Sequence, residues 1–219
     1  MTLQPLRALR ALAAIARDPD DTAQVFTLNE ALTGVRTPAW IARRLDGAPL
    51  LRERPEILDR LRDRDALRRL PAGSLAHAYL AFVEGEGISA DGLRDASVQG
   101  ERRAGDGEVE YVRRRMRDTH DLWHAVLGYQ GDVLGEAALL AFTFAQTRNP
   151  AIGALVLVGL AKLPFAGAHR LIASALVRGL RAAWFPAQPW ESLLPLPLTD
   201  VRARLAVDAP PAYAPVRTC

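Results

Sequence analysis

Apolar residues recur every three or four positions through most of the chain, the spacing that places side chains on one face of an α-helix. Helical segments with this spacing are expected at residues 1–17, 22–34, 52–70, 108–127, 136–146 and 171–180. Alternating apolar and polar positions, which are typical of β-strands, are scarce, and no repeat of fixed period is visible. The pattern therefore predicts an all-α, single-domain helical bundle.

Helix boundaries are marked by capping residues, glycines and prolines. Asp21 or Thr22 can cap the second helix, which Gly34 closes, while Ser74 and the Asn149-Pro150 pair can begin later helices. Residues 85–107 are polar and glycine-rich and predict a loop or hinge, and Pro164 breaks or bends the helix around it. Seven prolines between residues 186 and 215 predict a wrapping arm rather than packed helix. We divide the chain into an N-terminal amphipathic helix (1–20), a helical core (21–185) and a proline-rich C-terminal arm (186–219).

Composition narrows the functional classes. The 219 residues are 49% apolar and 24% charged, which is ordinary for a globular protein. A net charge of +3 allows contact with phosphates or anionic lipid, but does not require nucleic acid, and the arginines at 113–117 are typical of a charged helix face. The longest strongly apolar run, residues 151–161, is shorter than a membrane-spanning helix, which needs roughly 20 residues. A protein that is soluble or peripheral to a membrane is expected.

The two ends of the chain add little chemistry. Cys219 is the single cysteine, so neither an intrachain disulfide nor a cysteine-based zinc site is expected. Residues 1–17 contain three arginines and no acid, which faintly resembles an organellar presequence. A plain amphipathic helix that stops at Asp18-Pro19 is the favoured interpretation.

Candidate chemistry is concentrated in the segment Asp118-Thr119-His120-Asp121-Leu122-Trp123-His124. Residues four apart on a helix project from the same face, so His120 and His124 could bind one cation. Asp121 borders that face and could be a ligand or could orient one. The aspartate distinguishes this segment from the zinc-protease pattern, in which a glutamate follows the first histidine.

Glu136 can join the two histidines only if the chain reverses. An uninterrupted helix would separate it from His124 by about 18 Å, whereas metal ligands lie about 2 Å from a shared ion. Gly128, Gly131 and Gly135 lie in this interval and supply the backbone freedom for a reversal between two antiparallel helices. By spacing alone, a metal site and two ordinary core histidines are equally favoured. Mixed nitrogen and oxygen ligands would suit Zn, Mn or Fe.

The segment resembles the signature of the coenzyme Q (ubiquinone) biosynthesis protein four family, which is H-D-x-x-H, eleven residues, then E. His120, Asp121, His124 and Glu136 match every position of it. The resemblance extends over roughly residues 21–205 and includes Leu134-Gly135-Glu136-Ala137 and the Leu70 to Leu75 block. The loop at residues 129–132 and the proline-rich tail depart from the family pattern.

The resemblance implies a divalent cation, most often zinc with Fe or Mn as alternatives, held by His120, Asp121, His124 and Glu136, which would also be the catalytic residues. It implies metal-dependent decarboxylation, or oxidative decarboxylation, of a polyprenylated head group derived from 4-hydroxybenzoate. The implied partners are this quinone precursor, other ubiquinone biosynthesis enzymes and a membrane surface; a homodimer is compatible with these. The implied location is cytoplasmic and peripheral to the bacterial inner membrane, or the matrix side of the mitochondrial inner membrane in a eukaryote.

Two alternatives remain open. A non-catalytic scaffold would bind prenyl lipid and hold pathway enzymes together at the membrane, with residues 151–160 and 171–180 lining an apolar groove and nearby arginines facing headgroups. By periodicity alone, these two segments are more simply core helices. A phosphohydrolase could use His77, His120, Asp121 and Asp200, but this leaves His124 and Glu136 without a role.

Overall fold

The computed structural model describes residues 4–17, 22–33, 36–90, 107–163, 165–208 and 211–216, and this part of the chain is helical without any β-strand. The all-α prediction is confirmed. The helices are α1 Pro5–Arg17, α2 Thr22–Leu32, α3 Arg36–Arg44, α4 Pro49–Glu53, α5 Ile57–Arg62, α6 Arg64–Arg68, α7 Leu75–Gly85, α9 Glu108–Asp118, α10 His120–Leu127, α11 Val133–Thr147, α12 Pro150–Lys162, α13 Ala166–Arg181, α14 Trp190–Leu193 and α15 Leu198–Arg204. A 3-10 turn, η1, covers Phe185–Ala187.

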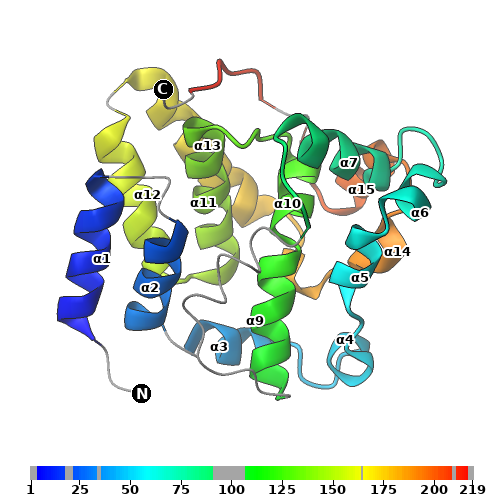
Figure 1. Cartoon of the computed structure of the whole chain (residues 1–219), viewed down its shortest axis with the longest axis horizontal. Coiled ribbons are helices and arrows are strands. Elements are labelled where there is room, and N and C mark those ends of the chain that lie inside the picture. The colour runs from blue at the N-terminus through cyan, green and yellow to red at the C-terminus, as the bar shows by residue number, and fades with distance from the viewer. Residues whose placement is uncertain are drawn as a thin grey trace.

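Helices α9, α10 and α11 lie in the middle of the molecule in Figure 1. To their left in that view, α1, α2 and α12 pack against one another around a small apolar cluster. To their right lie α4 to α7 together with α14 and α15. A second small cluster joins α3, α4 and α9. The largest core is formed by α7, α10, α11 and α13 with residues of α5, α6 and the C-terminal helices, and the candidate histidines lie on α10 at its edge.

The C-terminal region is more regular than the sequence predicted. Residues 190–204 contain α14 and α15, and the side chains of Trp190, Leu193 and Val201 are buried in the largest core. The expectation that this region contains no packed helix was therefore wrong. Its prolines precede or separate the short helices rather than interrupting them, as Pro197 does before α15. Residues 211–216 have no regular secondary structure.

Two expected long helices are divided. The segment at 52–70 is split into α5 and α6, because the Asp63 carboxylate accepts a hydrogen bond from the Ala66 N–H and begins a new helix. The segment at 108–127 is divided at Thr119, whose hydroxyl donates to the Arg115 carbonyl. Helices α3 and α4 were not predicted. Helix α4 has five residues, which is too short to show a periodic pattern.

The expected helix starts at Ser74 and Asn149 are confirmed. The Ser74 hydroxyl accepts from the His77 N–H, and the Asn149 side-chain oxygen accepts from the Ala151 N–H. The predicted roles of Asp21, Gly34 and Pro164, and of residues 91–106 within the glycine-rich interval, lie outside the described residues.

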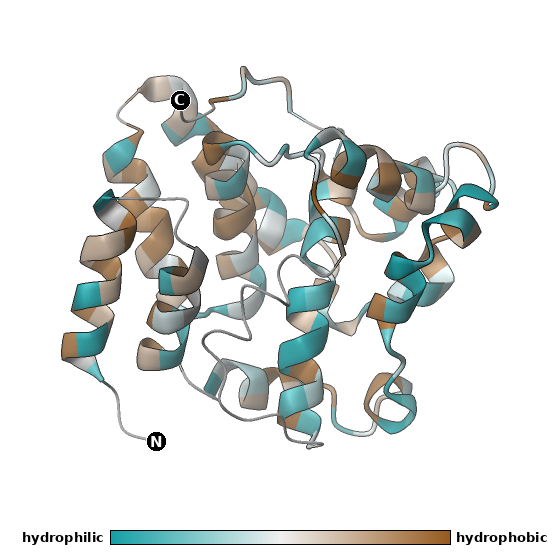
Figure 2. Cartoon of the chain, viewed as in Figure 1, coloured by the Kyte–Doolittle hydropathy of each residue, from teal (hydrophilic) through white to brown (hydrophobic). Residues whose placement is uncertain are grey.

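Within the described part of the chain, no helix has the length and apolar character needed to cross a bilayer. Helix α12 is largely hydrophobic, whereas α9 is largely hydrophilic (Figure 2). Leu155 of α12 and Ile172 of α13 are buried, but Leu157 and Leu180 are exposed. Each helix therefore packs one face against the rest of the protein and leaves apolar side chains at the surface, and the expected lipid groove remains a prediction.

Candidate metal centre

The two histidines of the motif lie one turn apart on α10, as their spacing predicts. Their Nε2 atoms are 3.2 Å apart. His124 is buried and His120 is partly exposed, so the pair lies at the edge of the core with one side open to solvent.

The chain reverses between α10 and α11. Gly128 ends α10 with a φ of 76°, in the left-handed region that glycine adopts without strain. Five residues later α11 begins, with the Asp132 side chain accepting from the Leu134 N–H. Glu136 stands in the first turn of α11, and its carboxylate oxygens are 3.1 Å from His124 Nε2 and 3.6 Å from His120 Nε2. The expected reversal is therefore present in the structure.

Gly135 permits the chain to pass close to this turn. A Cβ atom at Gly135 would collide with the carbonyl of Gln130 and lie 2.6 Å from the Tyr213 hydroxyl. The same hydroxyl accepts from the Gln130 N–H (2.8 Å) and donates to the Asp132 carboxylate (2.9 Å). Through Tyr213, the C-terminal segment thus hydrogen-bonds the loop that precedes Glu136. Tyr213 can approach this closely only because residue 135 has no side chain.

The ring of His124 is held from three sides. Its Nδ1 lies 3.0 Å from the Tyr129 carbonyl, and because a carbonyl only accepts, Nδ1 must carry the hydrogen. The Nε2 lone pair is then directed at Glu136 and His120. Phe82 of α7 stacks on the imidazole with ring centroids 4.6 Å apart and planes 12° apart. These contacts favour one tautomer and one orientation of His124, as is typical of histidines that bind metals.

Three acceptor atoms therefore converge with too few hydrogens between them. The ligand atoms of His120, His124 and Glu136 lie within 4.8 Å of one another, and this is the only such group in the described part of the chain. An imidazole with its single hydrogen on Nδ1 offers none at Nε2, and a carboxylate offers none. A proton on His120 or a bound cation must balance the lone pairs. Two imidazoles and a carboxylate are a donor set that Zn, Fe and Mn accept, so the residues fit a divalent metal.

Electrostatics of the cluster favour a positive charge. Burial acts to lower the pKa of His120, but the hydrogen bond and charge of Glu136 outweigh burial and raise it. Burial acts to raise the pKa of Glu136, but the two imidazoles outweigh it, so the pKa lies well below the usual range. Glu136 is therefore a carboxylate at neutral pH, ready to share a cation with the histidines.

Asp121 is not a member of this cluster. Its side chain is buried on α10, and burial raises its pKa above the ordinary value while the two histidines act to lower it. Its charge acts on both imidazoles, which fits an orienting role better than that of a ligand. Its predicted roles as ligand and catalytic residue remain predictions.

The set required by the phosphohydrolase alternative is not assembled. His77 Nε2 faces the Arg68 carbonyl at 3.3 Å, and Asp200 is exposed on α15. Neither residue belongs to the cluster of possible metal ligands found among the described residues.

Sequence reasoning missed three residues that support the site. Phe82, the Tyr129 carbonyl and the Tyr213 hydroxyl orient His124 or the loop before Glu136. Phe82 belongs to an apolar helical stripe and Tyr213 to a proline-rich tail, so neither showed a functional pattern. Only the Tyr129 carbonyl had a signal in the sequence. Gly128 ends α10, and a chain that turns there brings the next backbone carbonyl back beside the last helical turn, where His124 lies.

The fold and the site together define an all-α protein with a two-histidine, one-carboxylate centre between a helix and its returning neighbour. The model of the family described as coenzyme Q (ubiquinone) biosynthesis protein Coq4 matches residues 6–211. The chain belongs to this family.

Relatives support the assignment. The chain is 34% identical over 192 residues to a mitochondrial ubiquinone biosynthesis protein coq4 of Aspergillus flavus, covering 83% of this chain and 65% of that protein, slightly less than two thirds of its length. The corresponding protein of Uncinocarpus reesii is 32% identical over 193 residues, covering 83% of this chain and 67% of that protein. A crystal structure of a candidate ubiquinone biosynthesis protein from Nostoc punctiforme PCC 73102 has a TM-score of 0.68 at 24% identity, covering 95% of this chain and 100% of that one. This likeness supports the fold.

Proposed function

We propose that this protein acts in ubiquinone biosynthesis as a metal-dependent decarboxylase of a polyprenylated head group derived from 4-hydroxybenzoate. The observation that carries the proposal is the clustering of His120, His124 and Glu136, whose ligand atoms lie within 4.8 Å of one another in a chain that belongs to this family. The names of the relatives supply the pathway.

His120, His124 and Glu136 would hold the metal, which we propose to be zinc, with Fe or Mn as alternatives. When bound, a divalent cation supplies Lewis-acid attraction for a carboxylate or phenolate oxygen. The Tyr129 carbonyl and the Phe82 ring keep the His124 lone pair directed into the site. Glu136 and His120 are partly exposed, so a head group can reach the centre from the solvent side.

The proposed reaction breaks the bond between the ring carbon and the carboxyl carbon. Carbon dioxide leaves, the ring carbon keeps the bonding electrons, and it takes up one proton from water, which can enter at the exposed side of the site. Buried apolar residues next to the histidines, among them Leu122 and Val126, exclude water from the opposite side. The electrostatic attraction of charged groups for the developing negative charge is stronger in such a partly dry site than in water.

A complementation experiment tests this function. In cells that lack their own family member, the wild-type chain should restore ubiquinone, while His124→Ala should accumulate the precursor with its carboxylate intact. His169→Ala is the matched control, because His169 is exposed and lies outside the cluster. Elemental analysis should find one metal per chain in the wild type and in His169→Ala, and none in His124→Ala. Normal ubiquinone with His124→Ala would contradict the proposal. A hydroxyl at the decarboxylated carbon, rather than a hydrogen, would identify the oxidative form of the reaction.

A second candidate is a lipid-binding scaffold that organises ubiquinone biosynthesis enzymes at a membrane surface. Exposed apolar side chains on α1 and α12, two helices that contact each other, favour it. Leu6, Leu9 and Leu157 are 72%, 65% and 67% exposed. The relatives named mitochondrial fit a peripheral location on an inner membrane, at the matrix face in a eukaryote or the cytoplasmic face in a bacterium. In this case the purified protein would show no turnover, and His124→Ala would disturb folding or assembly only.

A further inference from the structure

A separate cavity lies at the other end of α11 from the candidate metal centre. It has a volume of about 290 Å³ and is lined by Leu32, Thr33, Arg36, Thr37, Trp40, Thr147, Arg148 and Pro150. These residues come from the end of α2, the start of α3 and the junction between α11 and α12. Thr147 stands eleven residues after Glu136 on one helix. At the rise of an α-helix, this is a separation of about 16 Å along the axis. The cavity is therefore a different place from the metal centre.

The charges that line this cavity are all positive. Among the described residues no acid lines it, and the side chains of Arg36 and Arg148 make no hydrogen bond or ion pair with the described part of the chain. Arg36 is the first residue of α3, where the helix dipole is positive and a cation is unfavourable. Helix α12 also begins at the cavity, with Pro150, and neither helix has an acid in its first turn. An anion would offset this accumulation of positive charge.

Of the three threonine hydroxyl groups that line the cavity, one is available to hydrogen-bond a ligand. Thr33 donates to the Asn149 side chain (2.7 Å) and Thr147 donates to the Thr143 carbonyl (2.8 Å), so both are engaged within the protein. Thr37 is 9% exposed and lines the cavity, and its hydroxyl makes no hydrogen bond with the described residues. A hydroxyl both donates and accepts, so Thr37 can hydrogen-bond a ligand oxygen in the cavity.

We propose that this cavity binds an oxyanion group, such as a phosphate, carried on an apolar or aromatic body. Arg36, Arg148 and Thr37 would bind the oxyanion, since guanidinium groups pair well with phosphate oxygens. Leu32, Trp40 and Pro150 form the apolar part of the lining and would contact the body of the ligand. The ring of Trp40 is held in place by the guanidinium of Arg44, 5.3 Å from its centroid, and by the edge of Trp184. This site goes beyond the proposed decarboxylation and does not depend on it.

Calorimetric titration with phenyl phosphate, inorganic phosphate and phenol tests the proposal on the full chain. Phenyl phosphate should bind saturably, inorganic phosphate more weakly and phenol least. Arg36→Gln and Arg148→Asn should each weaken phenyl phosphate binding roughly tenfold, as loss of one charge-assisted contact predicts, and the double variant should abolish it. Asparagine is chosen at position 148 because the backbone there has a φ of 52°, which asparagine tolerates. Arg170→Gln, at an exposed arginine on α13, is the matched control and should bind as the wild type does.

Nuclear magnetic resonance of the tryptophan indole N–H groups locates the ligand. Phenyl phosphate should shift one indole signal, and this signal should be the one missing from Trp40→Phe. Glu136→Gln should show the same shift, because the metal centre is not involved. Equal binding by the wild type and the double variant, equal affinity for phenol, or a shift that disappears in Glu136→Gln would each overturn the proposal, as would the absence of saturable phenyl phosphate binding. Thermal unfolding of each variant shows whether it is folded, and the single variants keep the test decisive if the double variant is not.

Discussion

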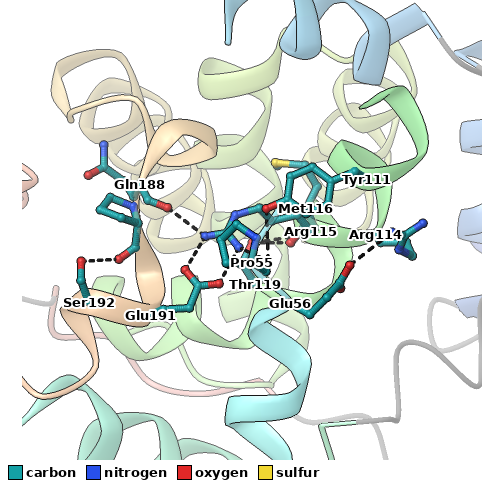
Figure 3. A network of polar contacts seen from close by, with 11 residues as sticks. Pro55, Glu56, Tyr111, Arg114, Arg115, Met116, Thr119, Gln188, Glu191 and Ser192 are labelled. Atoms are coloured by element: carbon teal, nitrogen blue, oxygen red, sulfur yellow. Dashed lines mark hydrogen bonds and ion pairs between the residues drawn. The ribbon is translucent and has the colours of Figure 1, made fainter. Parts of the chain in front are cut away.

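Two polar clusters, one centred on α9 and one on α10, are built in opposite ways. On α9, the buried guanidinium of Arg115 donates to both carboxylate oxygens of Glu191 (2.7 and 2.8 Å) and to the carbonyls of Pro55 and Gln188 (3.1 Å each) (Figure 3). Between α10 and α11, the ligand atoms of His120, His124 and Glu136 lie within 4.8 Å of one another. The Arg115 cluster, in which both terminal guanidinium nitrogens have acceptors and only Nε has none, braces the fold. The histidine cluster instead needs a proton on an imidazole or a bound cation to balance its lone pairs. The difference separates a structural ion pair from a candidate binding site.

The largest effect should come from breaking the Arg115 cluster. Glu191→Ala leaves the Arg115 guanidinium buried without its carboxylate, and we expect a loss of about 3 kcal/mol in the free energy of unfolding. Urea denaturation measures it. Glu56→Ala is the control, because it removes the partner of Arg114 at 3.3 Å in an ion pair at the surface. A loss of about 1 kcal/mol or less is expected for such a pair. Similar losses in both variants would show that the Arg115 cluster is not a brace.

The histidine cluster should respond to metal instead. Zinc at a hundredfold excess over its dissociation constant should stabilise the wild type by about 2.7 kcal/mol, because the ion binds only the folded state. Glu136→Gln should lose this gain, since an amide oxygen binds the ion more weakly than a carboxylate. Glu191→Gln should keep it, because it lies in the other cluster. Thermal unfolding after chelation and after zinc addition gives the comparison, and an equal gain in all three proteins would exclude a site at Glu136.

Gly135→Ala tests whether the reversal depends on close packing. The added methyl group would collide with the Gln130 carbonyl and crowd the Tyr213 hydroxyl. We therefore expect a destabilisation of about 2 kcal/mol together with weaker zinc binding. Gly85→Ala at the end of α7 is the control, because a Cβ there meets nothing within 4 Å. Urea denaturation and zinc titration measure the two effects. Unchanged zinc affinity in Gly135→Ala would mean that the position of Glu136 does not depend on this approach.

Tyr213→Phe should have the smallest effect at the metal centre. It deprives the Gln130 N–H of its acceptor and Asp132 of a donor. The expected result is a loss of about 1 kcal/mol and a severalfold lower zinc affinity. Ser192→Ala is the control from the Arg115 cluster, where an exposed hydroxyl donates to the Pro189 carbonyl and little change is expected. If zinc affinity stays constant in Tyr213→Phe, the C-terminal segment stabilises the loop without orienting Glu136.

Local signals predicted much of the fold. Capping residues such as Ser74 and Asn149 identified helix starts because a cap acts within three residues of itself. The same locality explains the errors. Helices α14 and α15 are four and seven residues long, too short for a periodic pattern, and burial of Trp190 and Val201 in the core fixes their position. The division at Thr119 falls inside an otherwise continuous helical pattern, where the apolar spacing gives no sign of a boundary.

The sequence by itself determined the candidate site's content: a histidine pair at helical spacing, a carboxylate twelve residues later, and Gly128 to reverse the chain between them. These are local properties, set by the geometry of a helix and by the backbone freedom of glycine. The tertiary structure alone decided how the candidate ligands are oriented. Phe82 and Tyr213 are far from His124 in the chain. Phe82 reaches the His124 ring, and Tyr213 reaches the loop before Glu136, only after folding brings α7 and the C-terminal segment to the site. The path of α11 likewise decides that Glu136, and not Asp121 of α10, completes the cluster of candidate ligands.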